Sequence, residues 1–299
     1  MNKLVVILGP TAVGKTKFAV QLANQFNGEI ISADSRQVYK QMTIGTGKDL
    51  EEYNIDTSHI PYHLIDILEP SEEYNLYKFK NDFNICFKNI LDKNKLPFLV
   101  GGTGLYIHSV LKNYDLKDVD FNSTRSIFLS TLSDSELGKI LSELNPNLHN
   151  TTDLIDRNRI IKAILIAETK SNQVENNIKF DPLVLGISEE REIIKNRITT
   201  RLKSRLKNGM IEEVESLVAN GISFEQLDFF GLEYRYISNY LKGEINYNDM
   251  YQKLNSSIHK FAKRQMTWFR KDKNIEWFDV DNKSDIEEIC KSIVLKLNA

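Results

Sequence analysis

The chain has few cysteines, no long hydrophobic run and almost no net charge. Its two cysteines, Cys86 and Cys290, form no ligand-like pair, so neither a disulfide framework nor a cysteine-bound zinc ion is expected. We expect no signal peptide, because the sequence opens on a strand-like segment, and no apolar run approaches the length of a membrane span. A formal net charge of −2 argues against a chain that is basic throughout, but leaves room for local basic surfaces. We expect a monomeric, cytoplasmic protein that does not contact membranes.

The first motif is a phosphate-binding loop. The apolar run Leu4–Leu8 is followed by a match to G-x-x-x-x-G-K-T, placed between a strand-like and a helix-like segment: Gly9, Pro10, Thr11, Ala12, Val13, Gly14, Lys15 and Thr16. The glycines let successive backbone N–H groups face one anion, and the following helix N-terminus adds partial positive charge. Lys15 supplies a point charge and Thr16 a hydroxyl group suited to Mg²⁺. The loop predicts binding of phosphate or diphosphate, whatever molecule carries it.

Strand-like and helix-like segments alternate over residues 3–113, which is typical of a parallel sheet wrapped by helices. The expected strands and helices in this part are 4–8, 29–33, 63–68 and 97–100, and 17–26, 74–93 and 105–111. Together with the loop, this alternation predicts an α/β fold with a P-loop NTPase-like parallel sheet flanked by helices.

Residues 114–180 read as a helical insertion, with helices over 123–170 and a polar link at 170–179. A fifth strand at 182–187 returns to the sheet. It is followed by helices at 189–208, 210–219, 233–242 and 247–271, an edge strand at 277–280 and a last helix at 284–297. The predicted domains are a catalytic core, made of residues 1–113 and 181–299 with its C-terminal helices, and the insertion.

Two other polar segments follow predicted strands: Asp34–Gln37 and Gly101–Gly104. Ligands of such sheets bind beyond the carboxyl ends of the strands, so both segments and the phosphate loop should meet at one cleft. An ATP-hydrolysing site needs a carboxylate at a strand end, whereas the fourth strand ends in Gly-Gly-Thr-Gly. Asp34 could instead take a proton from an acceptor, while Ser35 and Gln37 hydrogen-bond the edge of a base. A helix N-cap is the alternative role for Asp34.

Basic residues gather in three places. Seven of them, against the single acidic residue Glu192, lie between Arg191 and Lys207, and three of the seven recur every four positions on one helical face: Arg197, Arg201 and Arg205. The second cluster alternates with aromatic residues at 260–273, and the third lies at 157–162. A single cluster is usually a solvated helix face. Three clusters beside a phosphate-binding core favour a polyanionic partner.

Several stretches together resemble the tRNA dimethylallyltransferases. They are GPTAVGKT at 9–16, DSRQVYKQMTIGTGK at 34–48, PYHLIDILEP at 61–70, GGTGLY at 101–106, RITTRL at 197–202 and KRQMTWFR at 263–270, in order along nearly the whole chain. The resemblance implies transfer of a dimethylallyl group from dimethylallyl diphosphate to N6 of the adenine on the 3′ side of a tRNA anticodon. Diphosphate would be released.

The resemblance also assigns roles to residues. The loop at 9–16 would bind the donor diphosphate with Mg²⁺ held partly by Thr16, and the catalytic group would be Asp34 as general base with Thr103 and Arg201. The tRNA anticodon stem-loop, with the adenine flipped out of its stack, would be contacted by a further set: Asp34, Ser35, Arg36, Gln37, Thr103, Arg125, Arg159, Lys162, Tyr234, Arg235, Lys263, Arg264, Gln265, Trp268 and Arg270.

One segment departs from the family pattern. Gly231–Arg235 reads Gly-Leu-Glu-Tyr-Arg where the family usually has Gly-Tyr-Arg. Other functions stay open from the residues alone: an isopentenyltransferase acting on free AMP, ADP or ATP, a P-loop nucleotide kinase or ATPase, and a non-catalytic RNA-binding module. The extended basic surfaces favour RNA over a mononucleotide as the acceptor.

Overall fold

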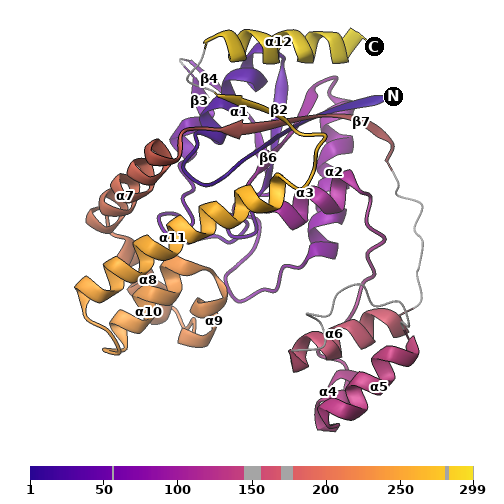
Figure 1. Ribbon diagram of the computed structural model, residues 1–299, viewed down its shortest axis with the longest axis vertical. Helices are drawn as coiled ribbons and strands as arrows, with labels where there is room; N and C mark the ends of the chain where they lie inside the picture. Colours follow the sequence, from indigo (N-terminus) through magenta and orange to yellow (C-terminus); the bar gives the residue numbers. More distant parts are fainter. Residues whose placement is uncertain (56, 145–155, 170–177, 280–282, 299) are drawn as a thin grey trace. The chain divides into compact units, whose positions relative to one another are not determined.

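The structure is a computed structural model that describes residues 1–55, 57–144, 156–169, 178–279 and 283–298. The chain divides into two units, one formed by Met1–Lys112 with Ile178–Ala299 and the other by Asn113–Asn177 (Figure 1). Most of the expected polar link at 170–179 lies outside the described residues. Among the helices that are described, none is both long and apolar enough to cross a membrane.

A six-stranded, all-parallel sheet forms the centre of the first unit. Its order across the sheet is β5 (Tyr62–His63), β2 (Gly28–Ala33), β6 (Leu96–Gly101), β1 (Asn2–Leu8), β7 (Phe180–Ser188) and β8 (Glu276–Asp279). The carboxyl ends are in register, because Gly101 pairs with both Ala33 and Leu8, and Leu8 pairs with Gly186. The loops that leave β1, β2 and β6 therefore start side by side at one edge.

Helices cover both faces of this sheet, as parallel strands require. Val5 and Ile7 of β1 pack toward α1 (Lys15–Gln25) and α12 (Lys283–Asn298), while Leu4, Val6 and Leu8 face the opposite core. That second core includes α2 (Leu76–Asp92) and α3 (Gly104–Leu111). The predicted P-loop NTPase-like fold is confirmed.

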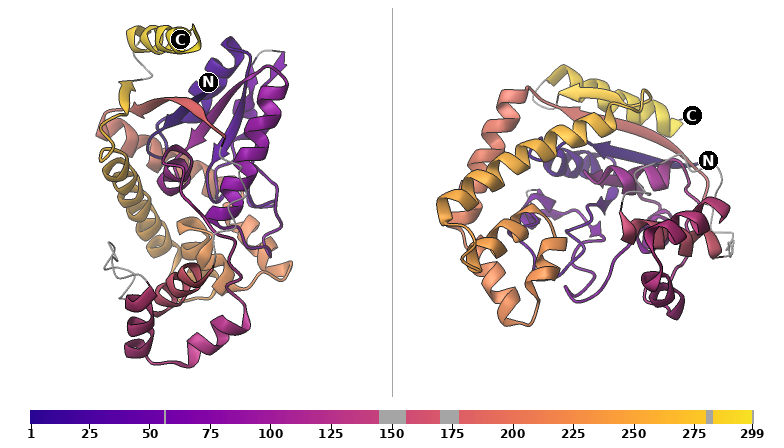
Figure 2. Two further views of the ribbon diagram at one scale, coloured as in Figure 1. Left: turned by 90° about the vertical axis from the view of Figure 1, so that its right-hand side faces the viewer. Right: turned by 60° about the horizontal axis from the view of Figure 1, so that its bottom comes forward.

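Five helices follow β7: α7 (Arg191–Lys207), α8 (Met210–Ala219), α9 (Phe224–Phe229), α10 (Leu232–Leu241) and α11 (Tyr247–Phe269). The long α11 runs from the cluster of α8, α9 and α10 back to the sheet (Figure 2). The short α9 is absent from our sequence-based prediction. A capping box of Ser223 and Gln226 starts it, and that local signal was available in the sequence.

The predicted third strand, 63–68, is wrong beyond His63. Leu64 and Asp66 have φ angles of 63° and 54°, a left-handed conformation that interrupts a regular strand, and only Leu68 makes a further isolated bridge, to Tyr39. The chain therefore leaves the sheet, and the Asp66 carboxylate pairs with the ammonium group of Lys48, whose side chain is fully buried. A 3-10 helix and a short antiparallel hairpin, which we did not expect, occupy the preceding segment: η1 (Leu50–Tyr53), β3 (Asn54–Ile55) and β4 (Ser58–His59).

The second unit contains α4 (Thr124–Thr131), α5 (Asp134–Leu144) and α6 (Arg157–Glu168). Their buried faces form a separate small core: Leu129, Leu137, Leu141, Ile160, Ile161, Ile164 and Leu165. Side-chain N-caps from Ser123 and Asp156 begin α4 and α6. The expected insertion spans residues 114–180. The observed unit begins one residue earlier, at Asn113, and its C-terminal boundary lies three residues earlier, at Asn177.

Candidate active site

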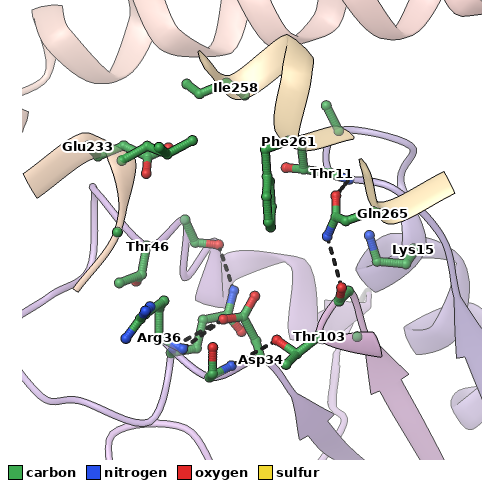
Figure 3. Close-up of a pocket in the computed structure, with 18 of the residues that line it drawn as sticks. Thr11, Lys15, Asp34, Arg36, Thr46, Thr103, Glu233, Ile258, Phe261 and Gln265 are labelled. Atoms are coloured by element: carbon green, nitrogen blue, oxygen red, sulfur yellow. Dashed lines mark hydrogen bonds between the residues drawn. The ribbon is translucent and has the colours of Figure 1, made fainter. Parts of the chain in front are cut away.

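A cavity of about 820 Å³ opens in the first unit beyond the carboxyl ends of β1, β2 and β6. It is lined by the phosphate loop, by the loops after β2 and β6, by η1, and by residues of α7, α10 and α11 (Figure 3). All three loops that we expected to converge on one cleft contribute to its wall. The cavity combines cationic, acidic and aromatic side chains on a sheet edge where ligands of this fold class bind.

The phosphate loop is bent by glycine. Gly14 has a φ of 90°, and a Cβ at Gly9 would lie 2.4 Å from the carbonyl oxygen of Ile187. The turn brings the N-terminus of α1 to the cavity, and Lys15 Nζ donates to the carbonyl oxygen of Pro10 at 2.6 Å. Burial, followed by the charge of Arg201, lowers the pKa of Lys15 to about 8. The geometry is that of an anion-binding loop.

Arg201 extends the anion site from α7. Its guanidinium donates to the hydroxyl oxygen of Thr11 in the phosphate loop. Burial and the neighbouring Arg205 lower the pKa of Arg201 to about 10, which leaves it charged at neutral pH. Arg205 in turn donates to the Asp49 carboxylate at 3.2 Å. Three cations from α7, these two and Arg197, therefore line the same cavity as Lys15.

Asp34 is held in place by its own backbone. Its Oδ1 accepts hydrogen bonds from the N–H groups of Arg36 at 2.9 Å and Gln37 at 3.4 Å. No helix begins there, so the alternative role of helix N-cap does not hold, although the side chain caps a turn in a similar way. The Ser35 N–H donates to Thr103 Oγ1 at 3.1 Å, which joins the loops after β2 and β6 (Figure 3).

Gln265 connects two of these loops from α11. Its Oε1 accepts from the Thr11 N–H and its Nε2 donates to the Gly102 carbonyl oxygen, each at 2.9 Å. A Cβ at Gly102 would lie 2.5 Å from this Nε2, and one at Gly101 would lie 2.2 Å from the Ala33 carbonyl oxygen. The close approach excludes a carboxylate at the end of β6. Gln265 was expected among the RNA contacts, but its amide is engaged within the protein.

The side chains of Gln37 and Arg36 are also oriented. Gln37 Nε2 donates to the Gly47 carbonyl oxygen at 3.1 Å, and the Arg36 guanidinium lies 4.8 Å from the centre of the Phe229 ring. Exposed aromatic rings complete this wall: Phe229, Phe261 and Trp268. Such rings are platforms on which an unpaired base or an apolar chain can pack.

A carboxylate that sequence reasoning missed anchors the loop after residue 42. Glu213 on α8 accepts hydrogen bonds from the N–H groups of Thr43, Ile44 and Gly45 at 2.8, 2.6 and 3.0 Å. It also accepts the hydroxyl proton of Tyr234 at 2.8 Å. Tyr234 is only 1% exposed, so this expected RNA contact is part of the core instead. No local signal marks Glu213, because its partners are about 170 residues away along the chain.

The other expected RNA contacts divide between the two units. In the first unit, Arg235 lines the cavity and donates to the Asp228 carbonyl oxygen, while the basic side chains at the end of α11 are exposed: Lys263, Arg264 and Arg270. In the second unit, Arg159 is exposed and Lys162 lies 5.3 Å from the centre of the Phe121 ring. Arg125 is paired with Glu168.

The residues present fit a magnesium ion that arrives with phosphate. Thr16 lines the cavity, but among the described residues no group of three His, Cys, Asp or Glu side chains could hold a metal alone. Mg²⁺ in phosphate sites keeps several waters and takes few protein ligands, together with phosphate oxygens. The hydroxyl group of Thr16 is of a type that could serve as one of these few protein ligands.

Comparison with known proteins gives consistent results. The model of the IPP transferase family matches residues 37–272, and that of isopentenyl transferase matches residues 2–61. A tRNA dimethylallyltransferase of Geotalea uraniireducens is 50% identical over 99% of this chain and 98% of its own. Another, from Azobacteroides pseudotrichonymphae, is 50% identical over 97% of each chain.

Solved structures agree with this similarity. The tRNA isopentenylpyrophosphate transferase of Bacillus halodurans has a TM-score of 0.73 at 33% identity, covering 100% of this chain and 97% of its own. A eukaryotic dimethylallyltransferase acting on tRNA shares the fold, with a TM-score of 0.72 at 24% identity over 93% of this chain and 74% of its own. The cavity, its phosphate loop and the full-length similarity lead to one conclusion: the chain belongs to the tRNA dimethylallyltransferase family of prenyltransferase enzymes.

Proposed function

We propose that this enzyme transfers a dimethylallyl group from dimethylallyl diphosphate to N6 of the adenine on the 3′ side of a tRNA anticodon. The observation that carries the proposal is one cavity lined by both a diphosphate-type anion site and the oriented carboxylate of Asp34. The anion site suits the leaving diphosphate, and the carboxylate suits deprotonation of the attacking amine. Full-length similarity to proteins named tRNA dimethylallyltransferase supports the same substrates.

In the proposed reaction, N6 forms a bond to C1 of the prenyl group while the C1–O bond breaks. The electron pair of that bond leaves with the diphosphate, and Asp34 accepts the N6 proton. An amine on an aromatic ring is a poor nucleophile, so a positioned base contributes about 10²–10⁴-fold. Because both backbone bonds go to Oδ1, the turn fixes the carboxylate without a further side chain.

The leaving group would be neutralised by Lys15 and Arg201, which hold fixed positive charge where negative charge develops. Mg²⁺, when bound at Thr16, would add charge neutralisation at the diphosphate. Thr103 holds the loop of Asp34 through the Ser35 N–H and lines the acceptor side of the cavity. Ser35 and Gln37 would read the edge of the flipped adenine.

The decisive experiment is incubation with labelled dimethylallyl diphosphate, Mg²⁺ and either bulk tRNA or free AMP. We expect label in tRNA alone. Label in AMP alone would establish the free-nucleotide isopentenyltransferase, and no label in either would refute prenyl transfer. An ATPase or nucleotide kinase is disfavoured because glycine packing excludes a carboxylate at the end of β6. The cytoplasmic location, the monomeric state and the individual RNA contacts stay predictions.

A further inference from the structure

The segment that departs from the family pattern places a carboxyl group in the cavity wall. Gly231, with a φ of 133°, precedes α10, whose first turn directs Tyr234 into the core and Glu233 to the cavity. Figure 3 shows Glu233 on this wall, on an element other than those of Asp34 and the phosphate loop. The proposed reaction does not use Glu233.

The groups around Glu233 are two cations in apolar surroundings. Beside the main cavity lies a small void lined by Glu233, Arg201 and Arg205 and otherwise by apolar side chains: Ile198, Leu202, Met210 and Ile258. Burial raises the pKa of Glu233, whereas the two guanidinium groups act in the opposite direction and Asp34 adds to the increase. Arg235, on the same helix, donates to the Asp228 carbonyl oxygen.

These cations are the ones that the donor would need. Arg201 already donates to Thr11 of the phosphate loop, and its side chain lines the same small void as Glu233. A carboxylate and a diphosphate bound in one cavity would repel one another. Protonation of the carboxylate removes the repulsion, and burial already favours the protonated form.

We propose that the carboxyl group of Glu233, which shares a cavity wall with Arg201 and Arg205, opposes donor binding while it is ionised and takes up a proton from solvent when diphosphate occupies the loop. The inference rests on the proposed function only in that the donor is a diphosphate. Its consequence is donor binding that is coupled to proton uptake. Two charges several ångströms apart near a protein surface interact strongly enough to change diphosphate affinity by roughly three- to thirtyfold.

The test is titration calorimetry with inorganic diphosphate and Mg²⁺ on the wild type, Glu233→Gln and the control Glu215→Gln, whose side chain is exposed on α8. The measured quantity is the ratio of wild-type to variant dissociation constants at each pH, which cancels the ionisations of diphosphate and Lys15. For Glu233→Gln the ratio should be close to one at acidic pH and should rise three- to thirtyfold as the wild-type carboxyl ionises. For Glu215→Gln it should stay at one.

A second measurement compares proton uptake. Titrations of the wild type and Glu233→Gln in two buffers of different ionisation enthalpy count the protons taken up when diphosphate binds. The wild type should take up more, because diphosphate and Lys15 contribute equally to both proteins. A ratio of one at every pH, weaker diphosphate binding by Glu233→Gln, or equal proton uptake by the two proteins would overturn the inference. Prenyl transfer to tRNA is assayed separately. Its absence would refute the proposed function, whereas a flat ratio with normal transfer would refute only the role of Glu233.

Discussion

The two units hold their charged groups in different ways. In the first unit, the site charges are tied to segments far away in sequence: Arg201 to Thr11 and Arg205 to Asp49. In the second unit, Arg125 pairs with Glu168, and Arg157 pairs with Asp134 and donates to nearby carbonyl oxygens. The first arrangement fixes charges around a cavity, whereas the second joins neighbouring helices at a surface.

This difference suggests that the first unit carries out catalysis and that the second contributes to RNA binding. Burial in the cavity shifts the pKa of Lys15 and Arg201 and strengthens their interaction with an anion, because water does not screen them fully. Pairs such as Arg125 with Glu168, whose side chains are 41% and 29% exposed, are screened and contribute little to stability. Substitutions in the first unit should therefore affect catalysis strongly, and those in the second should affect RNA affinity mildly.

The largest effect is expected at Asp34. Asp34→Asn keeps an oxygen that can accept the two backbone bonds but removes the base, so prenyl transfer should fall by about 10²–10⁴-fold. Binding of diphosphate and tRNA should stay within a few-fold of the wild type. Single-turnover transfer measures the effect, with Asp92→Asn on the exposed end of α2 as the control. Near-normal turnover would remove Asp34 from the mechanism.

Arg201→Ala should come next. Loss of one preorganised charge at a leaving diphosphate typically costs about 10²-fold, and here it should appear in kcat/KM for the donor. tRNA affinity, measured by filter binding, should change little. Lys203→Ala is the control, since Lys203 is exposed on the same helix. An effect confined to RNA affinity would contradict the donor role of Arg201.

Gln265 tests whether the cavity depends on links between loops. Gln265→Leu removes both bonds to the loops, and Gly102→Ala forces the Gln265 amide away, so both variants should raise KM for the donor by about tenfold. Gly138→Ala, at a glycine of α5 with nothing within 4 Å of the added Cβ, should leave KM unchanged. If only one of Gln265→Leu and Gly102→Ala raised KM for the donor, the hydrogen bonds of Gln265 to the two loops would not explain the effect.

The pH dependence of donor use should reflect Lys15. Its pKa of about 8 means that the free enzyme loses this charge as pH rises through that value, so kcat/KM for the donor should be highest below pH 8 and fall above it. The fall should approach tenfold per pH unit. Lys15→Arg keeps its charge throughout and should flatten this limb of the profile. If kcat/KM of Lys15→Arg still fell above pH 8 as in the wild type, the fall would be due to ionisation of another group.

The smallest effects are expected in the second unit. Arg159→Ala and Lys162→Ala should each weaken tRNA binding by a few-fold at low salt and by less at high salt, without changing KM for the donor. Arg157→Ala should behave differently and lower the melting temperature, because Arg157 is bonded within the unit. A large catalytic loss from Arg159→Ala would contradict the separation of the two units by role.

Much of the core could be predicted because its signals are local. The sequence G-x-x-x-x-G-K-T specifies a loop whose backbone geometry depends on its own glycines, and Asp34 follows a buried strand whose end is set by the sheet. Glu213 and Gln265 could not be given their roles in this way. Their partners lie about 170 and 160 to 250 residues away, so only the folded chain reveals them.

The predicted strand at 63–68 shows another limit. Its apolar residues fit a strand pattern, but the buried charge of Lys48 requires a partner, and Asp66 reaches it only from a left-handed backbone. A tertiary ion pair thus overrides a local preference. The burial of Tyr234 has a similar origin, since its place is determined by Glu213 on a different helix.

The position of β1 has a consequence for biosynthesis. β1 is made first, yet it pairs with β6 on one side and with β7 on the other, and β7 follows only after the second unit has been translated. Until residues 180–188 leave the ribosome, one edge of β1 has no strand beside it, and an unprotected edge invites association with other chains.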